Sequence, residues 1–154
     1  SGDPRLEKMG TTLVVDWLSG NQAHIAHIVD SRCYSLRGSQ ALCLTLDDTV
    51  VQNMLEDGRI PRADVPNVPF RNVLTTAVGT VEQAGPSYRR ETPDACDVLL
   101  LCSDGVTDSV PEYRWLEIHK ESDGMERTVQ AMIDAGLANE AGDNVSVVLL
   151  TLEY

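Results

Sequence analysis

Two aspartates stand where an apolar strand meets a turn, and together they could hold a cation. Asp104 follows the apolar run Val98–Cys102 in a Ser-Asp-Gly motif, and Asp143 precedes the apolar run 145–152 in a Gly-Asp-Asn motif. If the two runs form neighbouring strands, both carboxylates lie at one edge of the sheet. Two anionic groups held close repel each other unless a proton or a hard cation lies between them. The pattern therefore predicts a metal site at that edge.

A third aspartate, Asp30, has the same context, because it follows the predicted strand 23–29 and precedes a serine. Carboxylates suit Mg²⁺ or Mn²⁺ better than Zn²⁺, whose sites favour His and Cys. A water bound between two such ions loses a proton more easily and becomes a nucleophile near neutral pH. The alternative is that each aspartate only shapes a turn, since Asp beside Gly or Ser is common turn chemistry. Residue types and spacing alone favour a metal-binding α/β domain.

The other residues that could do chemistry show no comparable pattern. His24 and His27 lie three apart in a strand-like run, so they point to opposite faces and do not share a metal. His119 and the serines have no nucleophile motif around them, and no Walker-type glycine loop is present. The four cysteines lack C-x-x-C spacing, which favours free thiols in a reducing compartment and no zinc site.

Length and charge restrict the class of protein further. The 154 residues fit one domain, and the net charge of -12 argues against a nucleic-acid partner because phosphate binding needs a basic face. No apolar run approaches the roughly 20 residues of a membrane span, and no signal-peptide pattern opens the chain. We therefore expect a cytoplasmic protein with one domain over residues 10–154. Residues 1–9 are expected to be a leader that is disordered or left over from expression.

Apolar periodicity and turn residues predict the elements that would position the aspartates. We expect an antiparallel meander at the N-terminal end, a buried strand before Asp104, and two helices between that strand and the last one. A further helix is predicted between Asp47 and Gly58, and the proline-containing segment 60–70 is predicted to be a surface flap. Residues 81–93 are expected to be irregular or an edge strand. The strands are predicted at 11–18, 23–29, 32–36, 41–46, 96–102 and 145–152, and the two helices at 111–119 and 124–137.

The order of the motifs along the chain resembles that of a known family. These motifs are GTTLV (10–14), HIAHIVDSR (24–32), NVLT (72–75) with Gly79, LLLCSDG (99–105) and GDNVS (142–146). The series is similar to that of the metal-dependent serine/threonine protein phosphatases of type 2C (PPM) in their bacterial form. The resemblance covers nearly the whole chain from Gly10 onward.

The resemblance implies an α+β fold, a partial α-β-β-α sandwich of two antiparallel sheets flanked by helices. It implies that Asp104 and Asp143 ligate Mg²⁺ or Mn²⁺ and that Asp30 helps to hold a third, weaker ion. The segment 47–70 would be the flap that contributes to substrate choice. A metal-bound water would then attack phosphoserine or phosphothreonine of a protein substrate in bacterial signalling.

The sequence departs from the family pattern in two places. Val29 stands where the family has glycine, and a β-branched residue does not readily take a positive φ, which could re-aim Asp30 and weaken the third metal site. The family's opening third, which supplies a phosphate-binding arginine and a bridging aspartate, is missing. We therefore expect an uncovered sheet edge and face, which a homo-oligomer or a complementing N-terminal segment would hide.

Three functions remain compatible with these observations. The leading hypothesis is an N-terminally incomplete protein serine/threonine phosphatase, in which this chain alone has weak activity or none. The alternative is a catalytically silent phosphatase-like module that binds a partner. The third is a divalent-metal hydrolase of small phosphate esters, which a comparison of phosphopeptide and small-ester turnover would distinguish.

Overall fold

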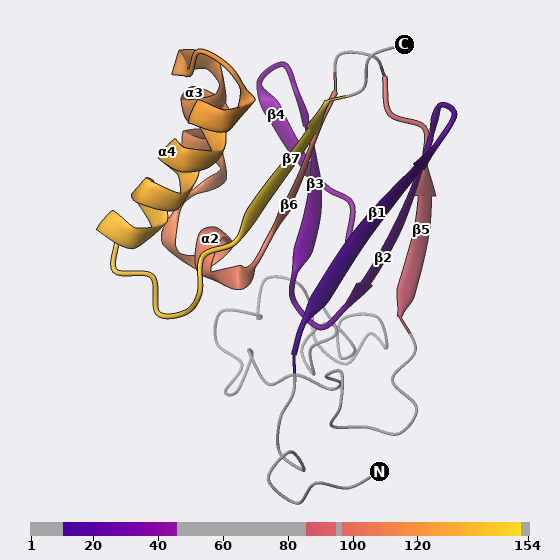
Figure 1. Ribbon diagram of the computed structural model, residues 1–154, viewed down its shortest axis with the longest axis horizontal. Coiled ribbons are helices and arrows are strands. Elements are labelled where there is room, and N and C mark those ends of the chain that lie inside the picture. Colours follow the sequence, from indigo (N-terminus) through magenta and orange to yellow (C-terminus); the bar gives the residue numbers. More distant parts are fainter. Residues whose placement is uncertain (1–10, 46–85, 95–96, 152–154) are drawn as a thin grey trace, which may run out of the picture.

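A computed structural model describes residues 11–45, 86–94 and 97–151. They form two antiparallel sheets that face each other, with helices on the outer side of one sheet (Figure 1). The predicted arrangement of two antiparallel sheets with flanking helices is confirmed. The first sheet has the order β1 (Leu13–Ser19), β2 (Gln22–Ile28), β5 (Ser87–Glu91), and the second β4 (Gln40–Cys43), β3 (Arg32–Arg37), β6 (Val98–Cys102), β7 (Val147–Thr151).

The N-terminal strands form two hairpins and not one meander. β1 pairs with β2 and β3 pairs with β4, each through a turn whose glycine has a positive φ, Gly20 or Gly38. Between β2 and β3 the chain leaves the first sheet and enters the second, where β3 pairs with β6. The prediction of a continuous meander is therefore wrong at residues 29–31. The chain turns there because Val29 takes a φ of 82° and is buried.

The predicted buried strand before Asp104 is confirmed as β6. It lies between β3 and β7 in the second sheet, and all five of its residues are buried. Because successive side chains of a strand alternate, Leu99 and Leu101 pack between the two sheets, while Val98, Leu100 and Cys102 pack beneath the helices. β6 therefore connects both cores, and its C-terminal end has a well-defined position.

The helical layer consists of α2 (Asp104–Ser109), α3 (Glu112–Glu121) and α4 (Met125–Ala138). The predictions of α3 and α4 are confirmed, whereas α2 was not predicted because it is short and begins with the turn-like Ser-Asp-Gly. Trp115 of α3 is fully buried and packs edge-on against Tyr34 of β3, with ring centroids 4.9 Å apart. None of the described helices is long and apolar enough to cross a membrane.

Two further predictions fall on particular segments. The predicted edge-strand character is confirmed for the described part of residues 81–93, where β5 pairs with β2 and has no second neighbour among the described strands. The helix predicted between Asp47 and Gly58 and the flap at 60–70 lie outside the described residues. The described cysteines, Cys33, Cys43 and Cys102, are free thiols, as expected.

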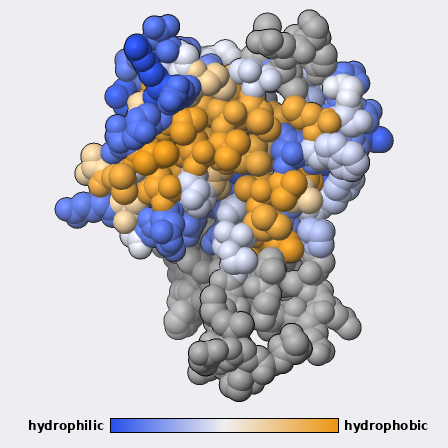
Figure 2. All heavy atoms as spheres, viewed as in Figure 1, coloured by the Kyte–Doolittle hydropathy of each residue, from blue (hydrophilic) through white to orange (hydrophobic). Residues whose placement is uncertain are grey.

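The outer face of the first sheet is apolar and exposed. Trp17 is 70% exposed and Tyr88 is 63% exposed, and Leu13 and Val15 are about half exposed at the positions of β1 that share the face with Trp17. Within the part of the chain that the structure describes, β1 and β7 are also edge strands, since each has one neighbour in its sheet. Figure 2, which has the same view as Figure 1, shows apolar side chains gathered over the middle of the described surface.

Candidate metal centre

Asp104 is held at the junction of β6 and α2. Ser103 keeps an extended backbone, with φ -78° and ψ 166°, and Asp104 is the first residue of the helix. The carboxylate accepts a 2.8 Å hydrogen bond from the backbone N–H of Gly105. An acidic side chain in the first turn of a helix also interacts favourably with the partial positive charge there. The side chain is half-buried and its backbone is fixed by the end of a buried strand.

Ser103 ties the loop that carries Asp143 to this junction. Its hydroxyl donates to the carbonyl oxygen of Asn144 at 2.8 Å and accepts from the backbone N–H of Ser146 at 3.1 Å. The backbone N–H of Ser103 donates to the carbonyl oxygen of Ser146 at 3.1 Å. This role of Ser103 was not predicted from the sequence. Its place between a buried strand and the Asp-Gly turn was the available signal.

Gly105 allows the two motifs to approach closely. A Cβ atom at this position would lie 2.3 Å from the carbonyl oxygen of Asn144 and 3.2 Å from that of Asp143. Any side chain larger than hydrogen would therefore push the loop away from α2. Asp143 itself is exposed, and one of its carboxylate oxygens accepts a 2.7 Å hydrogen bond from the backbone N–H of Asn144. The structure thus brings Asp104 and Asp143 to the same edge of the sheet, because β6 and β7 are neighbours.

The electrostatics of Asp104 reflect this arrangement. Burial raises the pKa of its carboxyl most strongly, and the charges of Asp143 and Asp108 raise that pKa further. The hydrogen bond from Gly105 and the positive charge of Arg32 act in the opposite direction. A divalent cation between the two carboxylates would relieve their repulsion, and oxygen donors of this kind suit Mg²⁺ or Mn²⁺. The residues present therefore fit the predicted ion.

Asp30 lies on the switch segment between the sheets and is half-buried. Val29 before it has a φ of 82°, so the expectation that valine would avoid a positive φ here is wrong. The hydroxyls of Thr12 and Ser31 share a 2.7 Å hydrogen bond that fastens this segment to the start of β1. Among the described residues no three His, Cys, Asp or Glu side chains gather closely enough to hold one metal ion. The structure therefore pairs Asp104 with Asp143 and leaves Asp30 outside that pair.

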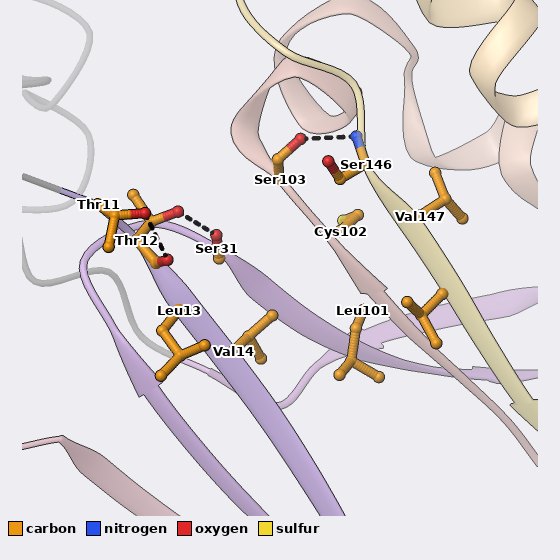
Figure 3. A pocket seen from close by; sticks show the side chains of 11 residues that line it. Thr11, Thr12, Leu13, Val14, Ser31, Leu101, Cys102, Ser103, Ser146 and Val147 are labelled. Carbon is orange, nitrogen blue, oxygen red and sulfur yellow. Dashed lines mark hydrogen bonds between the residues drawn. The ribbon is translucent and has the colours of Figure 1, made fainter.

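A cavity of about 350 Å³ opens beside Ser103, between the ends of β1 and β7 (Figure 3). The Thr12–Ser31 hydrogen bond lies on one wall and the Ser103–Ser146 hydrogen bond on the other. The remaining wall is largely apolar, and it is formed by Leu13, Val14, Leu101, Cys102, Val147 and Val148. The cavity thus separates the edge strands of the two sheets next to the candidate metal centre.

Known proteins share both the sequence and this architecture. The chain is 35% identical over 147 residues to the serine/threonine protein phosphatase PstP of Mycobacterium tuberculosis, covering 96% of this chain and 28% of PstP. It is 33% identical over 145 residues to the phosphatase Stp of Listeria welshimeri, covering 94% of this chain and 58% of Stp. The chain is a homologue of bacterial serine/threonine protein phosphatases. The predicted resemblance is confirmed, although no family model matches the chain.

Solved phosphatase structures extend the likeness to three dimensions. The crystal structure of M. tuberculosis PstP/Ppp superposes with a TM-score of 0.85 at 35% identity, covering 99% of this chain and 64% of that one. A structure of the PstP catalytic domain in complex with two manganese ions superposes with a TM-score of 0.79 at 33% identity, covering 96% and 60%. This phosphatase homologue therefore spans between a quarter and three fifths of the curated relatives it matches.

Proposed function

We propose that this chain is the metal-binding portion of a Mg²⁺- or Mn²⁺-dependent protein serine/threonine phosphatase. The observation that carries the proposal is the contact of Gly105 with Asn144, which sets Asp104 beside Asp143 in a homologue of bacterial phosphatases. The substrates would be phosphoserine and phosphothreonine side chains of proteins. The proposal takes residues 10–154 as one phosphatase-like domain. The free thiols of Cys33, Cys43 and Cys102 support a reducing, cytoplasmic location.

Asp104 and Asp143 would hold the ion, and Asp30 would help to hold a further one. A bound Mg²⁺ or Mn²⁺ supplies acidification of a coordinated water and neutralisation of charge on the transferred phosphoryl group. Ser103 and Gly105 would act on the loop and not on the substrate, since they keep Asp143 in place. Because no three His, Cys, Asp or Glu side chains gather into one site among the described residues, we expect the chain by itself to bind the ion weakly. This last point favours the alternative, a silent binding module.

Calorimetric titration with Mn²⁺ tests the proposed ligands. We expect weak binding by the natural chain and a further loss of affinity in Asp104→Asn and Asp143→Asn, because each variant removes one anionic ligand. Asp134→Asn is the matched control, since it makes the same change at an exposed aspartate of α4 that is not one of the proposed ligands. Equal Mn²⁺ affinity in all four proteins would rule out the assigned ligands.

Turnover of a phosphothreonine peptide and of p-nitrophenyl phosphate, each with Mn²⁺, distinguishes the functions. Peptide turnover that disappears in Asp104→Asn supports the phosphatase, and turnover of the small ester alone supports the small-ester hydrolase. Binding of the phosphopeptide without turnover supports the silent module. The same assays on a longer natural form of the protein show whether further sequence supplies the missing activity.

We infer that the apolar outer face of the first sheet is covered by a second copy of the chain or by a complementing N-terminal segment. The exposed side chains of Leu13, Val15, Trp17 and Tyr88 support this inference, since contiguous apolar surface usually marks an interface. Light scattering of the 154-residue chain should give a mass above that of the monomer, and Trp17→Glu should lower it. A monomer at high concentration, with no change in the variant, would argue against self-association.

A further inference from the structure

A buried carboxylate lies between the two sheets, away from the candidate metal centre. Asp16 occupies the middle of β1, at an inward position shared with Val14 and Leu18, which pack against the core between the sheets. Both oxygens of the Asp16 carboxylate are buried, and neither has a hydrogen-bond partner within the described residues. A buried polar group without a partner is costly, and an ionised one is more costly still.

The surroundings of Asp16 are mostly apolar. Ile25 lies opposite it on β2, and Leu99 and Leu101 of β6 belong to the same core. Asp16 lies close enough to the buried thiol of Cys33 on β3 that its charge helps to raise the pKa of that thiol. The titratable and charged groups on the described elements around Asp16 include His24 and His27 of β2, Cys33 of β3, and Tyr88, Arg90 and the Arg89–Glu91 ion pair of β5.

The protonation state of Asp16 should therefore change how well the sheets pack. Burial raises the pKa of its carboxyl above the ordinary value of 3.8, and the positive charge of His24 only partly opposes this. A protonated carboxyl removes the unpaired charge from the core, so folding favours the neutral form. The contribution of Asp16 to stability is then most favourable below pH 3.8 and is lost as the pH rises through the pKa of the folded state.

We propose that Asp16 makes the packing of the β1-β2-β5 sheet on the second sheet sensitive to pH. With the carboxyl neutral the sheets stay closed, and ionisation favours local opening of β1. β1 is suited to such opening because, among the described strands, it lies at the edge of its sheet and pairs with β2 only. An inward-pointing acid on an edge strand also discourages that strand from pairing with a wrong partner.

Alkylation of Cys33 reports this opening directly, because the thiol is fully buried in the closed form. The rate at Cys33 is measured by peptide mass spectrometry between pH 4 and pH 8 in the natural chain and in Asp16→Asn. The thiolate fraction of the open form rises with pH equally in both proteins, so it cancels in the ratio of the two rates. We expect this ratio to be near one at pH 4 and to rise with pH, by about tenfold for each unit of pKa shift.

Two further variants make the result decisive. Asp134→Asn, an exposed change on α4, should leave the rate at Cys33 unchanged at every pH. Asp16→Leu should melt at a higher temperature than the natural chain, with a difference that widens from pH 4 to pH 8, because it replaces the charge by an apolar side chain of similar size. A rate ratio that stays constant with pH would overturn the proposal. So would a natural chain that melts above Asp16→Leu at pH 8.

Discussion

The positive φ of Val29 leads to a quantitative prediction about two substitutions at one position. Val29 is fully buried and has a φ of 82°, a conformation that L-residues with a branched Cβ rarely adopt. Glycine takes such a φ without a steric cost, whereas alanine keeps most of the strain. The comparison of Val29→Gly with Val29→Ala therefore separates the strain of the backbone from the burial of the side chain.

The magnitudes follow from burial and from backbone energetics. Val29→Ala removes two buried carbons and should cost about 2–3 kcal/mol, including the cavity left behind. At an ordinary position, glycine would cost about 1.5 kcal/mol more than alanine, because it loses one more buried carbon and gains freedom in the unfolded chain. At Val29 the relief of left-handed strain returns about 1–2 kcal/mol. We therefore expect the alanine and glycine variants to have nearly equal stability.

Urea unfolding at 25 °C, followed by circular dichroism, measures the free energy of unfolding of each variant. The matched control is Val98, which is buried in β6 and keeps a strand backbone. At Val98 the glycine variant should be about 1.5 kcal/mol less stable than the alanine variant. If the gap between alanine and glycine were the same at both positions, the backbone at Val29 would not be strained and the reasoning would fail.

The remaining predictions concern the candidate metal centre and the ion pair between the buried Asp97 and the exposed Arg37. Gly105→Ala should separate α2 from the loop at Asn144, because a Cβ at this position would lie 2.3 Å from the carbonyl oxygen of Asn144. The Mn²⁺ affinity and the melting temperature should both fall. An unchanged Mn²⁺ affinity would contradict the assigned contact. Asp97 is buried and accepts two hydrogen bonds from Arg37, at 2.7 and 2.5 Å, which lower its pKa. The ionised Asp97 carboxylate stabilises the fold at pH values above the ordinary pKa of aspartate, and this stabilisation is lost as the pH falls through the lowered pKa of the folded state. Asp97→Asn should therefore flatten the acid side of a plot of melting temperature against pH. A slope equal to that of the natural chain would show that Arg37 does not favour the ionised form.

Sequence patterns determined the local features of this protein. Two-residue periodicity and glycine turns are local properties, which is why the hairpins and the buried strand before Asp104 were predicted correctly. The order of the motifs was enough to predict the similarity to bacterial serine/threonine protein phosphatases. The pairing of Asp104 with Asp143 was a conditional prediction, since it required their strands to be neighbours, and β6 and β7 are.

Only the tertiary structure decided the features that depend on residues distant in the chain. The change of sheet after β2 was not predictable from the sequence. Valine by itself prefers a negative φ, but Val29 is buried with a positive φ in the folded protein. The roles of Ser103 and Gly105 depend on a loop about 40 residues away, and the isolation of Asp16 depends on the apolar faces of both sheets. Local patterns carry the preferences of single segments, but burial and hydrogen-bond partners come from the packing of segments against one another.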